Sequence, residues 1–239
     1  MTSLANSIPT LSIVFAVYNE AESIESVIKE FYEEIGTKIP VEIIVAEDGS
    51  TDGTKDILKR LSKELPIRLN MKDDRRGYLK AIKDGLNDVR TPYAIFIDSD
   101  GQCIAKDFWK FWEHKDKCDM VLGWRSNRKD VLYRKVLSGG FQNIIKILFD
   151  GVPFHDLSCP YMLIKHNVIH TTIPEVKHLK YSCWPEFVVR VYRKGYNIIE
   201  VPIDHRERLA GETQVYKPTK LLKIMISQFI GAFSLYAEL

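Results

Sequence analysis

Hydrophobic and polar positions follow two alternating patterns along the first hundred residues. Short runs rich in β-branched and other apolar residues occupy 11–17, 42–46, 67–71 and 93–97. Between them, apolar residues recur every three or four positions within 24–35, 57–65 and 81–89. The short runs predict strands, and the longer period predicts amphipathic helices. Strands that alternate with helices over short connections indicate an α/β domain with a doubly wound, largely parallel sheet.

The second half of the chain is less regular. Residues 120–124 and 198–203 predict strands, and residues 132–149 and 185–194 predict helices. Beyond them, Lys217, Lys220 and Lys223 lead into an apolar segment that runs to the end of the chain. A basic start with an apolar body suits a helix that lies in the headgroup region of a membrane, or one that packs on the core or dimerises. We therefore divide the chain into a domain at 1–216 and a helix at 217–239.

Two acids follow the apolar run that ends at Ile97. Asp98 and Asp100 are separated by Ser99, directly after a predicted buried strand. The carboxyl ends of parallel strands meet at the edge of the sheet where ligands bind. Two carboxylates there suit a hard divalent cation that keeps open positions for substrate oxygens. A turn that caps the next helix is the alternative interpretation.

The first two strands also end in polar residues. Tyr18-Asn19-Glu20 follows one strand, and Glu47-Asp48-Gly49-Ser50-Thr51-Asp52 follows the other. We expect Asp48 to face a ligand, whose base or ribose can donate to it, while Thr51 or Asp52 caps the following helix. The phosphate-binding loops GxxxxGK[ST] and GxGxxG are missing from this position, so a charged ligand would bind through metal and side chains.

Composition narrows the class of partner. The sequence has 34 Lys and Arg against 32 Asp and Glu, a net charge of +2, which does not suggest nucleic-acid binding. The four cysteines lack metal-site spacing and are expected to be free thiols of a reducing compartment. Residues 1–10 lack the basic region and apolar run of a signal peptide, and we expect no segment long enough to cross a bilayer. These features predict a cytoplasmic location.

The order of these motifs resembles the family-two inverting glycosyltransferases of GT-A fold. The resemblance rests on residues 18–20 and 47–52, on Arg76-Gly77, and on residues 98–102. The second half is similar to the polyprenyl-phosphate sugar transferases, including the dolichyl-phosphate mannose synthases, through Gly123-Trp124-Arg125, Arg128, Arg134, Asn143, Asp156, Cys159 and residues 200–213. The resemblance implies a single Rossmann-like domain with a doubly wound mixed sheet.

For the donor, the resemblance implies a GDP- or UDP-sugar and a bound Mg²⁺ or Mn²⁺. The leaving diphosphate gathers negative charge, so a cation and basic side chains should meet it. We expect Asp100 to hold the metal, Asp98 to bind the metal or the ribose, and the Gln102 carbonyl to complete the shell. Arg206 and Arg208 are candidates for the diphosphate. The predicted donor-binding residues are Ala16, Tyr18, Glu20, Glu47, Asp48, Asp98, Ser99 and Arg206.

The acceptor decides whether a general base is needed. A sugar hydroxyl must lose its proton to a base, and Glu186 is the candidate, although it also forms an i,i+4 pair with Arg190. A lipid phosphate is already ionised and needs arginines instead, for which we propose Arg125 and Arg134 with Ser138. The predicted catalytic residues are Asp98, Asp100 and Glu186, while His155 and Asp156 are expected to line the site.

The function predicted from these residues is metal-dependent, inverting transfer of a sugar to a polyprenyl phosphate. The enzyme would work as a peripheral protein on the inner face of the membrane, held by its last helix or by a membrane partner subunit. A glycosyltransferase acting on a sugar or glycan hydroxyl is one alternative. A nucleotidyltransferase would carry a basic, glycine-rich loop where this chain has Tyr18-Asn19-Glu20, and a silent nucleotide-sugar binding module would not need both Asp98 and Asp100.

Overall fold

A computed structural model describes residues 7–127, 132–208 and 221–239, with the backbone alone for 132–136. Seven strands form a mixed sheet in the order β3-β2-β1-β4-β6-β5-β7. The strands are β1 Leu11–Val17, β2 Val41–Glu47, β3 Ile67–Met71, β4 Tyr93–Asp98, β5 Met120–Arg125, β6 Met162–Lys165 and β7 Ile198–Ile203. The predicted α/β fold with a doubly wound mixed sheet is confirmed.

The central strand β1 explains where the polar motifs meet. All seven of its residues are buried, as expected for a parallel strand covered on both faces. It runs parallel to β2 and to β4, and Ala16 pairs with Ala46 on one side and with Asp98 on the other. The three strands therefore end level with one another. This register brings residues 18–20, Asp48 and the acids at 98 and 100 to one edge of the sheet.

Strand β6 carries the same edge into the second half of the chain. It is antiparallel to both β4 and β5, with Met162 opposite Phe96 and Leu122. As a result β5 runs in the same direction as β4, and its last residue, Arg125, lies at the edge where Asp98 lies. The residues just before β6 reach this edge as well. The sequence pattern did not predict β6, because only four residues form it.

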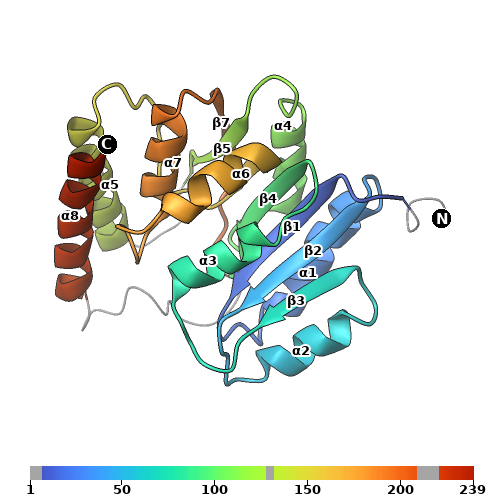
Figure 1. Cartoon of the computed structure of the whole chain (residues 1–239). Coiled ribbons are helices and arrows are strands. Elements are labelled where there is room, and N and C mark those ends of the chain that lie inside the picture. Colours follow the sequence, from blue (N-terminus) through green and yellow to red (C-terminus); the bar gives the residue numbers. More distant parts are fainter. Residues whose placement is uncertain (1–6, 128–131, 209–220) are drawn as a thin grey trace.

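Helices cover the sheet and extend beyond it. They are α1 Ile24–Phe31, α2 Thr54–Leu61, α3 Tyr78–Asn87, α4 Phe108–Trp112, α5 Leu132–Leu148, α6 His166–Thr172, α7 Trp184–Arg193 and α8 Leu221–Glu238. A π-helical turn follows α1 at Tyr32–Gly36, and 3₁₀ turns occupy Ala105–Asp107 and Ile173–Glu175. Helix α3 packs on β1 and β2, while α5 and α8 lie side by side at the end of the molecule away from β3 (Figure 1).

Helix α8 is anchored to the domain by polar contacts at two levels. Gln228 is buried and bonds to the backbone of residues 181 and 182, at 3.4 and 3.5 Å. Glu238 pairs with Arg190 at 2.9 Å and with Lys177 at 2.8 Å. Gly231 passes so close to the loop that an added Cβ would lie 2.5 Å from the carbonyl oxygen of His178. The helix is therefore part of the folded body.

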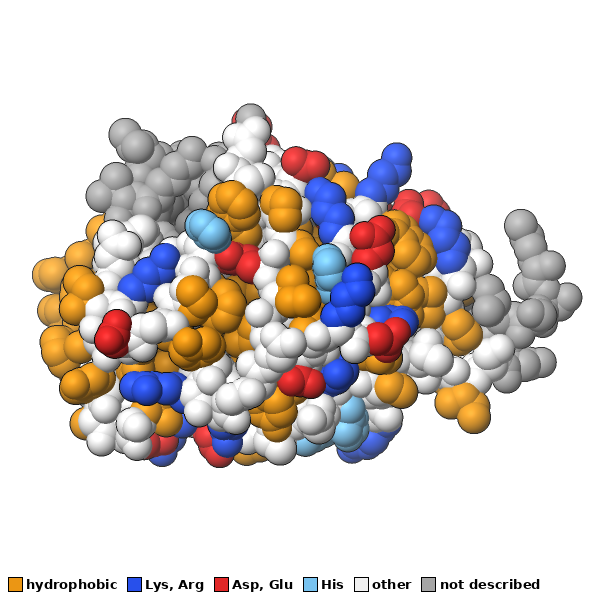
Figure 2. Space-filling view, turned by 90° about the horizontal axis from the view of Figure 1, so that it is seen from above, with side chains coloured by type: hydrophobic (Ala, Val, Ile, Leu, Met, Phe, Trp, Pro, Cys, Tyr) orange, Lys and Arg blue, Asp and Glu red, His pale blue; other side chains and the backbone are white. Residues whose placement is uncertain are grey.

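The outer face of α8 is apolar. Leu222, Ile226, Ile230 and Phe233 are 52 to 72% exposed and recur at helical spacing. Figure 2 shows hydrophobic side chains gathered at the end of the molecule that α8 forms. By length and composition Leu221–Glu238 could cross a membrane, so the expectation that no segment has this length was wrong. The helix starts earlier than the uncharged stretch suggested and includes Lys223 and Glu238.

Candidate active site

A cavity of about 410 Å³ opens at the carboxyl edge of the sheet. Its walls come from the ends of β1, β4 and β5, from the start of α3, and from α5, α7 and α8. The predicted residues that line it are Ala16, Tyr18, Glu20, Asp48, Asp98, Ser99, Asp100, Arg125, Ser138 and Arg208. Strand and helix ends far apart in the sequence thus build one site.

Asp98 and Asp100 lie at the base of this site. Asp98 Oδ1 accepts a hydrogen bond from the Tyr78 hydroxyl at 2.7 Å. Burial and the neighbouring charge of Asp100 raise the pKa of Asp98 to about 7. Asp100 Oδ1 accepts from the Gln102 backbone N–H at 3.1 Å, and its Oδ2 lies 3.6 Å from Arg208 Nη1. The two carboxylates therefore oppose each other's ionisation, and Arg125 and Arg208 offset part of their negative charge.

These two acids fit a divalent cation. Carboxylate oxygens are the ligands that Mg²⁺ and Mn²⁺ take, and a cation relieves the repulsion that raises the pKa of Asp98. Within the described ranges, no group of three or more His, Cys, Asp or Glu gathers into a full metal cage. Mg²⁺ commonly uses one or two carboxylates and fills its other positions with water and substrate phosphates. The pair therefore suits a metal that is shared with a phosphorylated ligand.

Gln102 does not lie among the residues that line the cavity. Its side-chain amide donates to the carbonyl oxygen of Arg206 at 3.4 Å. Its backbone, through the bond to Asp100, shapes the loop after β4. The geometry supports a loop-forming place for Gln102 rather than the predicted metal contact.

The far wall of the site carries Tyr18 and Asp48. Asp48 accepts the backbone N–H groups of Arg76 and Gly77, both at 2.8 Å. This approach depends on Gly49, where φ is +77° and an added Cβ would lie 2.4 Å from the backbone of Asp74. The Arg75 guanidinium lies 3.9 Å from the centre of the Tyr18 ring. An aromatic face, a carboxylate and a cation therefore meet where a nucleobase could stack and bond.

Buried hydrogen bonds hold the loops around this wall. Ser99 Oγ donates to the carbonyl oxygen of Ala16 at 3.1 Å, which ties β4 to β1 beyond their last pair. Glu20 pairs with Arg208 and accepts from Ser23 at 2.9 Å, and burial raises its pKa. Asp52 accepts the first backbone N–H of α2, that of Thr54, at 3.1 Å, but the N-cap position expected for Thr51 or Asp52 is occupied by Gly53.

Two predicted donor-binding residues lie behind the site rather than in it. Glu47 is 1% exposed, accepts the backbone N–H of Ser50, and has Lys55 Nζ 3.8 Å from its other oxygen. Arg206 donates to the carbonyl oxygen of Gly101 and pairs with Glu30 at 2.5 Å. Neither side chain lines the cavity. Both predictions need correction: these residues brace the loops after β2 and β4.

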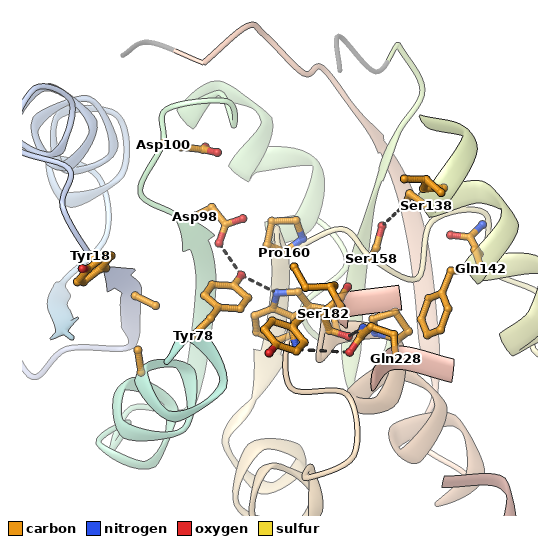
Figure 3. Close-up of a pocket in the computed structure, with 18 of the residues that line it drawn as sticks. Tyr18, Tyr78, Asp98, Asp100, Ser138, Gln142, Ser158, Pro160, Ser182 and Gln228 are labelled. Carbon is orange, nitrogen blue, oxygen red and sulfur yellow. Dashed lines mark hydrogen bonds between the residues drawn. The ribbon is translucent and has the colours of Figure 1, made fainter. Parts of the chain in front are cut away.

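Arg125 stands on the opposite wall from Tyr18. Its Nε donates to Asp156 Oδ2 at 2.7 Å, and its Nη2 donates to Asp156 Oδ1 at 3.0 Å and to Ser158 Oγ at 2.8 Å. Ser138 Oγ lies 3.5 Å from Ser158 Oγ (Figure 3). An arginine and two hydroxyls on one wall are suited to an anionic oxygen group. Arg128 and the Arg134 side chain lie outside the described residues.

His155 does not line the cavity, contrary to expectation. Its ring stacks on Trp124 with centroids 4.5 Å apart, and its Nδ1 lies 2.6 Å from a Glu200 oxygen. Glu200 also accepts the backbone N–H groups of His155 and Asp156, the latter at 3.0 Å. The predicted place of His155 was wrong. Asp156 supports the site from behind, as the partner of Arg125.

Glu186 is fully buried and does not line the cavity. Its oxygens accept the backbone N–H groups of Lys177, His178 and Leu179 at 2.8 to 2.9 Å. They also accept Arg190 Nε at 3.1 Å. A carboxylate with its oxygens engaged by the fold cannot reach a substrate proton. The predicted catalytic role of Glu186 needs correction, and the helix ion pair is the interpretation that the geometry supports.

Several site residues were missed. Tyr78, Ser158 and Arg75 line the cavity, together with apolar residues of α5 and α8. Ser158 was hidden because β6, which brings its segment to this edge, was not predicted. Tyr78 directly follows Gly77 at the start of a helix, and a tyrosine there has no periodic signal of its own. The apolar residues of α5 and α8 were expected on helices, but nothing in the sequence indicated that the two helices line the same cavity.

The family model and three relatives that match this chain are all glycosyltransferases or sugar-transfer enzymes. The model of glycosyl transferase family 2 matches residues 12–172. A dolichyl-phosphate beta-glucosyltransferase of Trichomonas vaginalis is 28% identical, over 94% of this chain and 76% of that protein. The glycosyltransferase AglD of Haloferax volcanii is 28% identical, over 86% of this chain and 34% of that protein. A dodecaprenyl-phosphate galacturonate synthase of Rhizobium johnstonii is 26% identical, over 84% of this chain and 60% of that protein.

Solved structures share the fold. Glucosyl-3-phosphoglycerate synthase of Mycobacterium tuberculosis, in complex with UDP, aligns with a TM-score of 0.69 and 17% identity, over 96% of this chain and 80% of that one. Mannosyl-3-phosphoglycerate synthase of Rubrobacter xylanophilus aligns with a TM-score of 0.71 and 13% identity, over 96% and 74%. The first enzyme has also been solved with Mn²⁺ and UDP-glucose, and that structure aligns with a TM-score of 0.68 and 16% identity, over 96% and 80%.

Proposed function

Because the chain belongs to glycosyl transferase family 2, we propose that it transfers a sugar from a nucleotide-sugar to a polyprenyl phosphate, with inversion and with a divalent cation. One observation carries the proposal. One cavity is lined by the acids at the end of β4, by Arg125, and by an apolar wall of side chains from α5 and α8. The proposed donor site, the proposed anion-binding wall and an apolar surface therefore belong to one cavity.

The apolar wall favours a lipid acceptor. It is formed by Leu137, Phe141 and Ile144 of α5 and by Leu221, Ile224, Met225 and Phe229 of α8. A nucleotide and a small sugar offer little apolar surface to bury there. Each buried methylene of a prenyl chain gains about 0.8 kcal/mol. The names of two relatives, a dolichyl-phosphate and a dodecaprenyl-phosphate transferase, support the same class of acceptor.

At the donor end, Asp98 and Asp100 would hold Mg²⁺ or Mn²⁺. The metal, when bound, would neutralise the charge that gathers on the leaving diphosphate. Tyr18 and Asp48 would bind the base by stacking and by hydrogen bonds. Arg208 lines the cavity beside Asp100 and adds positive charge near the diphosphate. These roles leave both GDP- and UDP-sugars open as donors.

At the acceptor end, Arg125 with Ser138 and Ser158 would hold the lipid phosphate. A phosphate oxygen attacks the anomeric carbon, the new carbon–oxygen bond forms, and the bond to the diphosphate breaks with its electron pair. The acceptor is ionised before it attacks, so the step needs no general base, which agrees with the burial of Glu186. Attack from the wall opposite the diphosphate inverts the anomeric centre.

The outer face of α8 would place the enzyme on the membrane that carries its acceptor. Leu222, Ile226, Ile230 and Phe233 form an exposed apolar stripe, and Lys223 lies beside its start. The other face of the same helix forms part of the cavity wall. Such a helix can lie in the headgroup region while the domain stays in the aqueous phase. A peripheral, cytoplasmic-face location follows from this proposal, and α8 would be the attachment.

A donor screen tests the proposal. The purified chain is incubated with Mn²⁺, radiolabelled UDP- or GDP-sugars and either undecaprenyl or dolichyl phosphate, and the product is extracted into organic solvent. We expect label in the organic phase for one donor, and none when the lipid is omitted or Asp100 is replaced by alanine. Label that stays in water-soluble glycans with every lipid would contradict the proposal and favour a hydroxyl acceptor.

A further inference from the structure

Tyr78 connects the two halves of the site through its hydroxyl group. The hydroxyl lies 2.7 Å from Asp98 Oδ1 and 3.1 Å from Trp184 Nε1. Figure 3 shows Tyr78 between Asp98 and the segment that carries Ser182, with a dashed line to each side of its hydroxyl. Three elements thus meet at one oxygen atom: β4 through Asp98, α3 through Tyr78, and α7 through Trp184.

The chemistry of the three groups fixes the direction of both hydrogen bonds. An indole N–H can only donate, so the Tyr78 oxygen accepts from Trp184. With Asp98 ionised, as a bound cation requires, its carboxylate can only accept, so the hydroxyl donates its single proton to Oδ1. The chain of bonds therefore runs from Trp184 through Tyr78 to Asp98 Oδ1. Asp98 itself lines the cavity, so Oδ2 is the oxygen that we assign to a ligand there.

Trp184 is itself held firmly. Its side chain is 2% exposed, and its ring packs on Phe96 with centroids 4.6 Å apart. Phe96 precedes Asp98 by two residues on the same strand, so both ends of the chain of bonds rest on β4. A buried donor with a fixed ring has one direction in which to point its N–H. The Tyr78 hydroxyl is consequently oriented by the protein before any ligand arrives.

The start of α3 also holds the second acid of the donor wall. The backbone N–H of Gly77 donates to Asp48 Oδ2 at 2.8 Å, and Tyr78 follows Gly77 directly. Consecutive residues therefore fix Asp48, which we assign to the base, and Asp98, which we assign to the metal or ribose. This arrangement sets the distance between the two carboxylates through one rigid helix end.

We propose that Tyr78 is a positioning residue, oriented by Trp184, that turns the Asp98 carboxylate so that one oxygen faces the bound cation or ribose. The inference rests on the proposed function, because it concerns how the donor site is prepared. Tyr78 would not touch the reacting atoms. Its effect would appear in metal and nucleotide binding first and in turnover through them.

The test compares Tyr78→Phe, Trp184→Phe and the double variant with the wild-type chain. Mn²⁺ binding is measured by the electron paramagnetic resonance of free Mn²⁺, with UDP or GDP present, and is independent of turnover. Tyr93→Phe is the matched control, because its hydroxyl also donates to a carboxylate, Asp116, at 2.9 Å but outside the cavity. Melting temperatures of all variants show whether each is folded.

We expect Tyr78→Phe to bind Mn²⁺ about tenfold more weakly, since it loses a hydrogen bond to a charged group. Trp184→Phe should weaken binding about threefold, because Tyr78 keeps its proton but loses its fixed direction. The double variant should be no weaker than Tyr78→Phe, because Trp184 acts through Tyr78. Raised Mn²⁺ should restore most of the turnover of Tyr78→Phe, and Tyr93→Phe should match the wild type.

Two results would overturn the inference alone: a folded Tyr78→Phe variant that binds Mn²⁺ like the wild type, or single effects that add fully in the double variant. A wild-type chain that binds neither Mn²⁺ nor either nucleotide would overturn the proposed function and this inference with it. The wild-type measurement therefore separates the two failures.

Discussion

Arg125 and Asp156 form a two-point ion pair on the wall of the cavity, with Nε–Oδ2 at 2.7 Å and Nη2–Oδ1 at 3.0 Å. The carboxylate comes from the segment that precedes β6, and the guanidinium ends β5. Such a fork fixes the plane of the guanidinium, and Ser158 bonds to the same Nη2 at 2.8 Å. The arginine that we assign to the acceptor phosphate is thus oriented by a residue behind the wall.

Replacing Asp156 by asparagine should therefore impair the acceptor and spare the donor. The variant keeps the shape of the side chain but loses the charge and one acceptor oxygen of the fork. We expect the KM for polyprenyl phosphate to rise about tenfold, with the KM for the donor unchanged. Initial rates at varied acceptor measure this. Asp116→Asn, on the surface, is the control, and an equal rise of both KM values would contradict the assignment of Arg125 to the acceptor.

Asp100 should be required for metal-dependent turnover. Asp100→Asn removes a charge from the site where Asp98 and Asp100 oppose each other's ionisation. We expect turnover to fall by about 100-fold or more, since it removes electrostatic stabilisation of the leaving group. The Mn²⁺ dependence of the remaining rate should shift to higher concentration. A variant that retains full activity at low Mn²⁺ would disprove the metal assignment.

Glu186 should matter for stability rather than for chemistry. In Glu186→Gln, an amide NH₂ group would face backbone N–H donors that now meet a carboxylate oxygen. We expect a loss of about 2–4 kcal/mol in the free energy of unfolding, measured by urea denaturation. Turnover per folded molecule should stay close to wild type at a temperature where the variant is folded. A stable variant without turnover would instead favour a hydroxyl acceptor that needs a base.

The apolar stripe of α8 should carry membrane binding. Ile226→Ser combined with Phe233→Ser removes two of its exposed side chains, which are 52% and 58% accessible. We expect co-sedimentation with anionic vesicles to fall several-fold while the melting temperature holds, because neither residue is part of the core. Ile8→Ser is the control, since Ile8 is 87% exposed and lies outside α8. Equal loss in both proteins would mean that no particular surface binds the vesicle.

The anchoring of α8 should depend on pH through Glu238. Hydrogen bonds from Lys177 and His178 lower the pKa of Glu238 from 4.5 to about 2. A carboxyl with a lowered folded-state pKa stabilises the fold above its unfolded value, and this contribution is lost as the pH falls from about 4.5 towards 2. Glu238→Gln should remove this part of the pH dependence. Melting temperatures of both proteins across that range measure it, and parallel curves would contradict the assignment.

The first half of the fold could be predicted because local hydrophobic patterns mark its strands and helices. Apolar runs and helical spacing located β1, β2 and β4, and parallel pairing then placed Tyr18, Asp48 and Asp98 at one edge. The second half depends on β6, a four-residue strand whose place between β4 and β5 is set by tertiary pairing. Because β6 was not predicted, the sequence analysis could not place Ser158 beside Arg125.

The remaining wrong predictions concern side chains whose partners come from distant segments of the chain. The sequence allowed Glu186 to be either a base or the partner of Arg190. The backbone N–H groups that settle its place belong to residues 177–179, which have no side-chain signal. Arg206 was predicted from its motif to meet the diphosphate, but Glu30 on α1 holds its guanidinium behind the loop. Charge patterns along a chain show which residues can ionise, and only the fold shows what they face.

The most direct test of the account compares two acceptors that differ in one group. The chain is given the preferred nucleotide-sugar with Mn²⁺ and either a polyprenyl phosphate or the corresponding polyprenol, and products are identified by mass spectrometry. We predict a product with the mass of the polyprenyl phosphate plus one sugar residue, and no product from the polyprenol. Transfer to the polyprenol at a comparable rate, or no transfer to the phosphate with any donor, would contradict the central claim.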